Sequence, residues 1–134
     1  MAWVRSLIFA ILLVSWSTFV SFAFIPVFFM PWRGATALQR TWSAGVLAMA
    51  KWFIGIRYEV KGLEHLPEAP FIVACKHQST FETLVLSVAL RDAAYVVKKE
   101  LMQIPLFGWY GWPARHIPVD RKAGSKALRL SLIH

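Results

Sequence analysis

Between Arg5 and Arg33 the chain carries no charged residue, and this gap limits what the sequence can fold into more than any other feature. The run SLIFAILLVSWSTFVSFAFIPVFFMPW exceeds the roughly 20 apolar residues that a helix needs to cross a bilayer. A cleaved signal peptide would have a shorter apolar region, about 7 to 15 residues, before a small-residue cleavage site, which we do not find. We therefore expect a retained membrane helix, with a cleaved signal as the alternative.

Two prolines and a tryptophan stand at the end of this run. Pro26 and Pro31 predict that the helix ends or kinks in its second half, because proline lacks the amide hydrogen that a helix interior needs. Trp32 suits the interfacial zone of a membrane, where aromatic rings with a polar edge settle. A helical hairpin that enters the bilayer from one side is therefore an alternative to a full span.

Basic residues are unevenly distributed around the run. Arg5 and the amino terminus precede it, whereas Arg33, Arg40, Lys51 and Arg57 follow it. By the positive-inside rule, this imbalance places the bulk of the chain on the cytoplasmic side of the membrane.

Residues 34–56 carry the periodicity of an amphipathic helix. Apolar side chains recur there at spacings of three or four: Leu38, Trp42, Val46, Met49 and Phe53. One interpretation is that this face packs against the rest of the protein. The other is that the helix lies on the membrane surface, with Arg40 and Lys51 toward the lipid headgroups.

The overall composition indicates a lipid environment and an anionic partner. Hydrophobic residues make up 57% of the 134 residues, and the mean hydropathy is +0.51. Fifteen Lys and Arg against seven Asp and Glu give a formal charge of +8, which favours phosphate-bearing ligands, and the apolar content favours lipids over nucleic acid. The single cysteine, Cys75, allows no internal disulfide and no zinc-type ligand set. We therefore expect no metal site and no nucleic-acid partner.

From residue 57 onward, strand patterns alternate with helix patterns. Strands are expected at 57–61, 70–75, 93–97 and 116–119, and helices at 80–90 and 125–133. This alternation predicts an α/β fold in which helices flank a parallel or mixed sheet. The expected organisation is an N-terminal membrane-anchoring helix or helical hairpin at 1–56 and an α/β domain at 57–134. Because the chain stops at His134 inside a predicted helix, we expect the domain to be incomplete at its C-terminus.

The stretch ACKHQSTFETL carries the candidate chemistry. Ser79 and Glu82 have the Ser-x-x-Glu spacing of a capping box, which predicts a helix beginning after Ser79. His77 would then lie in the loop before that helix, where open α/β sheets place their ligands. In one interpretation Glu82 only caps the helix. In the other, His77 is a general base and Glu82 orients it. Cys75 is a weaker candidate, as a nucleophile, since a cysteine between apolar strand residues is usually a buried small hydrophobe.

The same stretch resembles the glycerolipid acyltransferases of the 1-acyl-sn-glycerol-3-phosphate acyltransferase type. KHQSTFETL is similar to their His-x-x-x-x-Asp signature, with Glu82 in place of the usual aspartate. VVKKELMQIPLFGWYGW resembles the family's Lys-x-Glu-Leu, Ile-Pro and Phe-Gly run, and IPVDR resembles its Ile-Asp-Arg ending. The matching blocks extend over roughly residues 57 to 126.

The resemblance implies a specific reaction and specific residue roles. The family transfers a fatty acyl group from acyl-CoA or acyl carrier protein to the sn-2 hydroxyl of lysophosphatidate, which yields phosphatidate. It implies His77 as the base, Glu82 as its partner, and Lys98 and Arg121 as ligands of the substrate phosphate. The acyl thioester is a co-substrate and no further cofactor is implied. The implied location is the bacterial inner membrane, with the catalytic domain facing the cytoplasm.

The chain departs from the family pattern in two places. Arg115 and Pro118 stand where the family block often has Gly and Phe, and the family's Phe-Pro-Glu-Gly-Thr-Arg block is absent from these residues. Two alternatives therefore accompany the main prediction. One is a truncated, non-catalytic membrane module that binds anionic lipids. The other is an acyltransferase of the same fold that acts on another acceptor, such as a lyso-ornithine lipid.

Overall fold

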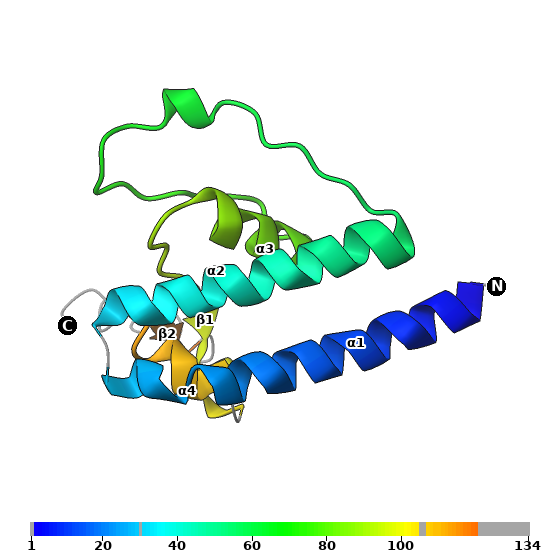
Figure 1. The fold of residues 1–134 in the computed structure, drawn as a ribbon. Coiled ribbons are helices and arrows are strands. Elements are labelled where there is room, and N and C mark those ends of the chain that lie inside the picture. The colour runs from blue at the N-terminus through cyan, green and yellow to red at the C-terminus, as the bar shows by residue number, and fades with distance from the viewer. Residues whose placement is uncertain (1, 30, 105–106, 121–134) are drawn as a thin grey trace. The chain divides into compact units, whose positions relative to one another are not determined.

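The computed structural model describes residues 2–29, 31–104 and 107–120 (Figure 1). Its helices and strands, in chain order, are α1 (Ala2–Ala23), α2 (Trp32–Met49), α3 (Thr80–Ala89), β1 (Val96–Lys98), α4 (Phe107–Gly111) and β2 (Ile117–Val119). Short 3-10 helices lie at Ile25–Phe29, Leu63–His65 and Lys99–Gln103, and a π-helix at Ala50–Ile54 follows α2.

The chain divides into two compact units that interleave along the sequence. Unit 1 comprises Met1–Phe19 and Arg40–Arg91, and unit 2 comprises Val20–Gln39 and Asp92–His134. Both α1 and α2 therefore contribute residues to each unit. The predicted division into a membrane-anchoring region at 1–56 and an α/β domain at 57–134 stays a prediction.

Helix α1 ends where the prolines predicted a break. It stops at Ala23, the 3-10 helix that contains Pro26 follows, and α2 begins directly after Pro31. Residues Trp3–Ala23 are long and apolar enough to cross a membrane. Their most apolar stretch has a mean hydropathy of 2.0, and only 6% of that stretch is buried. Signal sequences near an N-terminus share these properties, so the retained membrane helix stays a prediction.

In unit 1, α1 and α2 approach each other closely through tryptophan side chains. Trp16 Nε1 donates a hydrogen bond to the Trp42 carbonyl at 3.1 Å, and Trp42 Nε1 donates to Ser17 Oγ at 3.0 Å. At Gly45, a Cβ atom would lie 2.3 Å from Cε2 of the Trp16 ring. Glycine is therefore required here for the helices to come this close.

In unit 1, α2 also packs against α3. Val46 and Leu47 of α2 are buried together with Leu84 of α3, and partly buried apolar side chains from α1, α2 and α3 surround them: Leu13, Trp16, Trp42, Met49, Phe81, Val85 and Val88. The predicted amphipathic helix is therefore confirmed. Of its two interpretations, packing against the rest of the protein accounts for this part of the helix.

Unit 2 contains the sheet, which consists of β1 and β2 in parallel within the described part of the chain. The register pairs Val96 with Ile117 and Lys98 with Val119. Two parallel strands need a crossover connection, and the 3-10 helix at Lys99–Gln103 and α4 provide it. The expected strand at 116–119 is thus confirmed over Ile117–Val119, whereas the one expected at 93–97 begins three residues later and ends one residue later, as Val96–Lys98.

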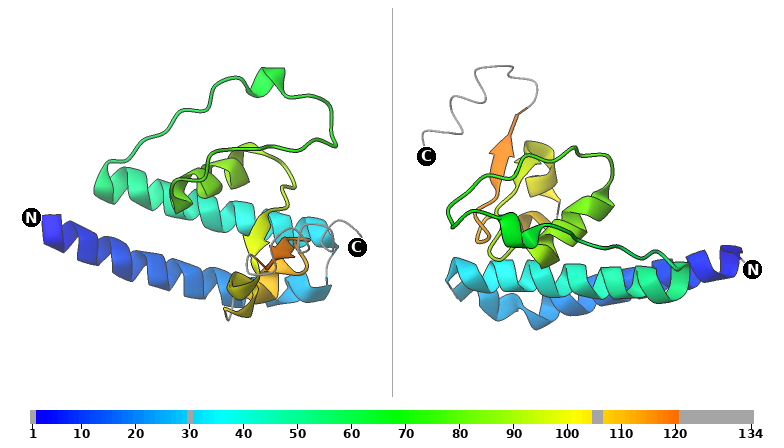
Figure 2. Two further views of the ribbon diagram at one scale, coloured as in Figure 1. Left: turned by 180° about the vertical axis from the view of Figure 1, so that it is seen from behind. Right: turned by 90° about the horizontal axis from the view of Figure 1, so that it is seen from above.

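The predicted strands at 57–61 and 70–75 are wrong. Residues 56–62 and 71–78 form no strand, and Figure 2 shows the connection from the π-helix after α2 to α3 as a long loop with one short helical turn. Their composition suits strands, but a strand also needs a hydrogen-bonding neighbour, and no described residue supplies one. Ile72, at 97% exposure, shows the consequence. The described sheet is therefore two-stranded, instead of a larger mixed sheet flanked by helices. The predicted helix at 125–133 lies outside the described residues.

Candidate active site

The start of α3 carries the capping box that the sequence predicted. Ser79 is the N-cap with extended backbone (φ −152°), and its hydroxyl oxygen accepts a hydrogen bond from the Phe81 amide at 3.2 Å. Glu82, the third helical residue, reaches back and accepts from the Ser79 amide at 2.9 Å. Because these bonds satisfy amides that have no partner within the helix, they fix where α3 begins.

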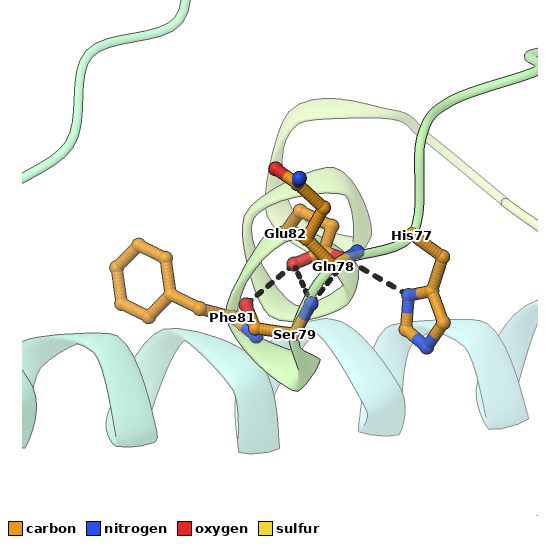
Figure 3. A network of polar contacts seen from close by, with 5 residues as sticks. All are labelled: His77, Gln78, Ser79, Phe81 and Glu82. Carbon is orange, nitrogen blue, oxygen red and sulfur yellow. Dashed lines mark hydrogen bonds and ion pairs between the residues drawn. The ribbon is translucent and has the colours of Figure 1, made fainter.

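His77 lies beside the same carboxylate. Its Nδ1 is 2.8 Å from Glu82 Oε1, and the imidazole reaches the carboxylate from the extended segment that precedes α3 (Figure 3). On one regular helix, residues five apart diverge by roughly 140° and could not meet. The contact therefore depends on the turn at Ser79, and the cap and the histidine contact coexist.

Both carboxylate oxygens of Glu82 accept hydrogen bonds from residues at the start of α3. Oε1 accepts from the Gln78 amide at 2.7 Å and the Ser79 amide at 2.9 Å, besides its contact with His77. Oε2 accepts from the Ser79 hydroxyl at 2.6 Å and from the Ser79 amide at 3.1 Å. Sequence reasoning missed the Gln78 amide. This hydrogen bond could have been predicted from the position of Gln78 immediately before the N-cap, because a backbone amide there lacks a partner within the helix.

These hydrogen bonds keep Glu82 ionised. The side-chain hydrogen bond from Ser79, reinforced by the Ser79 amide, lowers the pKa of Glu82 from 4.5 to about 2. An ionised carboxylate only accepts hydrogen bonds, so the donor in the contact with His77 is Nδ1–H. In a neutral imidazole with its proton on Nδ1, the lone pair is on Nε2, which can accept a proton from a ligand.

Acidification is expected to weaken the start of α3 through Glu82. Because the folded state lowers the pKa of this carboxyl, its contribution to stability is fully present above pH 4.5 and is lost as the pH falls toward about 2. We expect the difference in thermal midpoint between the wild type and Glu82→Gln, followed by circular dichroism, to shrink over that range. A difference that stays constant throughout the range would contradict this explanation.

The other predicted site residues lie elsewhere. Lys98 ends β1 in unit 2, where its Nζ is 3.7 Å from Glu100 Oε1 and both side chains are about half exposed. Arg121 lies outside the described residues. Cys75 is exposed, contrary to its expected burial as a small hydrophobe, since no strand of the described residues pairs with its segment. In residues 2–29, 31–104 and 107–120, no group of three or more His, Cys, Asp or Glu side chains could hold a metal ion.

Comparison with known proteins decides the family. The sequence model of the family described as Acyltransferase matches residues 57–132, a region that includes His77, Glu82 and Lys98. The chain belongs to this acyltransferase family. The resemblance inferred from the sequence motifs is therefore confirmed.

Relatives of this acyltransferase-family chain carry a consistent name. The 1-acyl-sn-glycerol-3-phosphate acyltransferase of Pseudomonas aeruginosa is 35% identical over 131 residues, which cover 94% of this chain and 50% of that protein. The 1-acyl-sn-glycerol-3-phosphate acyltransferase alpha of Mus musculus is 32% identical over 115 residues, covering 84% and 40%. The human alpha protein is 30% identical over 115 residues, with the same coverage. The chain thus spans about half the length, or less, of these relatives. No solved structure matches it.

Proposed function

We propose that this chain carries the general-base part of a 1-acyl-sn-glycerol-3-phosphate acyltransferase. The reaction transfers a fatty acyl group from acyl-CoA or acyl carrier protein to the sn-2 hydroxyl of lysophosphatidate and yields phosphatidate. The family membership and the names of the relatives support this class of reaction. The observation that carries the proposal is the 2.8 Å contact between His77 Nδ1 and Glu82 Oε1.

The contact suits direct general-base catalysis. With Nδ1–H donated to Glu82, Nε2 of His77 takes the proton of the acceptor hydroxyl while that oxygen attacks the thioester carbonyl carbon. The resulting tetrahedral intermediate collapses, the carbon–sulfur bond breaks, and the departing thiolate takes the proton from the imidazolium. No covalent enzyme intermediate forms. The Glu82 carboxylate stabilises the imidazolium while it exists and keeps the ring oriented.

The local environment supports this division of roles. The His77 side chain is 66% exposed, whereas Glu82 is 27% exposed and is held by the backbone at the start of α3. A substrate can therefore approach the imidazole, while the carboxylate that orients it stays fixed. Fixing the orienting group before the reaction is what preorganised catalysis requires.

Lys98 and Arg121 are proposed to bind the phosphate of the acceptor. An ammonium and a guanidinium are the side chains that best complement a phosphate monoester. The present partner of Lys98, Glu100, is 3.7 Å away in an exposed pair, and such pairs contribute little to stability. A dianionic phosphate could therefore displace it.

The proposed location is the bacterial inner membrane, with the catalytic residues on the cytoplasmic side. Helix α1 has the length and hydropathy for the membrane, and most of its side chains are exposed. The basic residues that follow it favour the cytoplasmic orientation. Acyl-CoA and acyl carrier protein, the two proposed donors, are cytoplasmic molecules, so the donor could reach the site directly.

An acyl-transfer assay tests the proposal and its alternatives. Membranes containing the protein, together with any residues that its reading frame adds after His134, are supplied with labelled acyl-CoA or acyl carrier protein and one lysolipid acceptor. We expect labelled phosphatidate from lysophosphatidate. Transfer to a lyso-ornithine lipid instead would assign another acceptor. Absence of transfer to either acceptor would favour a non-catalytic module that binds anionic lipids.

A further inference from the structure

Two arginines share one tryptophan ring in unit 2. The Cζ atom of Arg115 lies 5.0 Å from the centroid of the Trp32 ring, and that of Arg33 lies 5.6 Å from the same centroid. Both distances fall within the roughly 6 Å range of a cation–π contact. The two arginines are exposed, whereas Trp32 is half-buried. The fold thus holds two solvent-facing guanidinium groups at one aromatic side chain.

These two cations lack an internal counter-charge among the residues that the structure describes. The ion pairs of the described residues involve other side chains, and neither Arg33 nor Arg115 forms an ion pair with a described carboxylate. Like charges held near one ring repel each other, and the negative face of the indole offsets only part of that repulsion. An external anion bound beside the ring would relieve the remainder.

The backbone conformation at Arg115 indicates that the arginine side chain has a function at this position. Its φ is 60°, in the left-handed region that disfavours residues other than glycine and asparagine. Two hydrogen bonds of the turn hold this conformation: the Arg115 amide donates to the Trp112 carbonyl at 3.0 Å, and the His116 amide donates to the Gly111 carbonyl at 3.0 Å. A glycine would fit this turn with less strain. Strained positions of this kind often coincide with functional sites.

The position of Trp32 in the chain indicates what the anion is. Trp32 follows the candidate membrane span and the exposed apolar residues Ile25 and Phe29, at 48% and 91% exposure. Tryptophan is enriched where a membrane meets water, at the depth of the lipid phosphates. A guanidinium binds phosphate oxygens through two parallel hydrogen bonds. We propose that Trp32, Arg33 and Arg115 form a binding site for the phosphate of an anionic phospholipid, separate from the catalytic pair.

Vesicle binding of the 134-residue chain tests the site. Vesicles of phosphatidylcholine alone are compared with vesicles that also contain phosphatidylglycerol, which is neither the acceptor nor the product of the proposed reaction. The Arg33→Gln/Arg115→Gln variant is measured beside an Arg57→Gln/Arg91→Gln control, which removes the same charge from exposed positions. We expect the site variant to lose affinity for the anionic vesicles by about fivefold for each arginine. Its binding to phosphatidylcholine should match that of the wild type.

Three results would overturn the site. An equal loss of affinity in the control variant would show that only the overall charge matters. An unchanged affinity of the site variant for anionic vesicles would show that the two arginines do not bind lipid. Binding of inorganic phosphate that is lost in the site variant, while anionic-vesicle binding stays equal to that of the wild type, would assign the cluster to a free anion. If the Arg33→Gln/Arg115→Gln variant melts at a lower temperature than the wild type, the single variant Arg33→Gln replaces it in the experiment. Trp32→Leu should also weaken anionic-vesicle binding, because the ring no longer holds the guanidinium groups in place.

Discussion

The His77→Ala variant is expected to lose acyl transfer, with a fall in rate of about 10²- to 10⁴-fold, the usual contribution of a general base. The reason is that His77 Nε2 is the proposed acceptor of the hydroxyl proton, and alanine leaves no group to take it. The measurement is the initial rate of phosphatidate formation in membranes that contain equal amounts of each variant. Because the His77 side chain is exposed and makes no contact in the apolar core of unit 1, the fold should tolerate its removal.

The chain provides a matched control for this experiment in His65. This histidine also lies in the connection between α2 and α3, and its Nε2 is 3.5 Å from Glu64 Oε1, with both side chains strongly exposed. It lacks the fixed carboxylate that the capping box provides. We expect His65→Ala to keep the wild-type rate. Ordinary turnover by His77→Ala, or equal losses in the two variants, would remove His77 from the mechanism.

The Glu82→Gln variant is expected to lose a comparable part of the rate. Glutamine keeps the length of the side chain and an acceptor oxygen for the Ser79 amide, but it removes the negative charge. Neutralising the carboxylate that orients a catalytic histidine can lower kcat by up to about 10⁴-fold, because the imidazolium loses its stabilisation and the ring loses its preferred tautomer. Glu82→Asp keeps the charge at a shorter reach, so it should recover part of the rate.

A Ser79→Ala variant separates catalysis from capping. Removing the Ser79 hydroxyl takes away the bond to the Phe81 amide and the bond to Glu82 Oε2, and leaves the contact between His77 and Glu82 Oε1. We expect a loss of about 1 kcal/mol of stability, as for other N-cap serines, with most of the rate retained. Matched losses of stability and rate in Ser79→Ala and Glu82→Gln would show that Glu82 acts through the helix cap alone.

Features that depend on neighbouring residues could be predicted from the sequence. The Ser79–Glu82 capping box placed the start of α3 correctly, and Pro26 and Pro31 placed the break between α1 and α2. The same local reasoning required His77 to lie outside the helix if it was to reach Glu82. Helix caps and proline breaks involve residues within one or two turns of each other, so their geometry is encoded in short stretches.

Features that depend on distant partners could not be predicted in this way. Residues 57–61 and 70–75 have strand composition, yet neither segment has a neighbour to pair with among the described residues. The segment that became β1 has a similar composition and does pair, with Ile117–Val119. Alternation and branched side chains describe one strand at a time, whereas a sheet needs two strands in register.

The sequence by itself therefore determined the apolar N-terminal helix, the start of α3 and the family of the chain, and it left the contact between His77 and Glu82 as one of two interpretations. Only the tertiary structure decided which extended segments form a sheet, that α2 packs against α3, and that Arg115 shares the Trp32 ring with Arg33. The physical reason is the range of the interactions. Caps and turns are closed by atoms a few residues apart, but pairing and packing join residues that only the folded chain brings together.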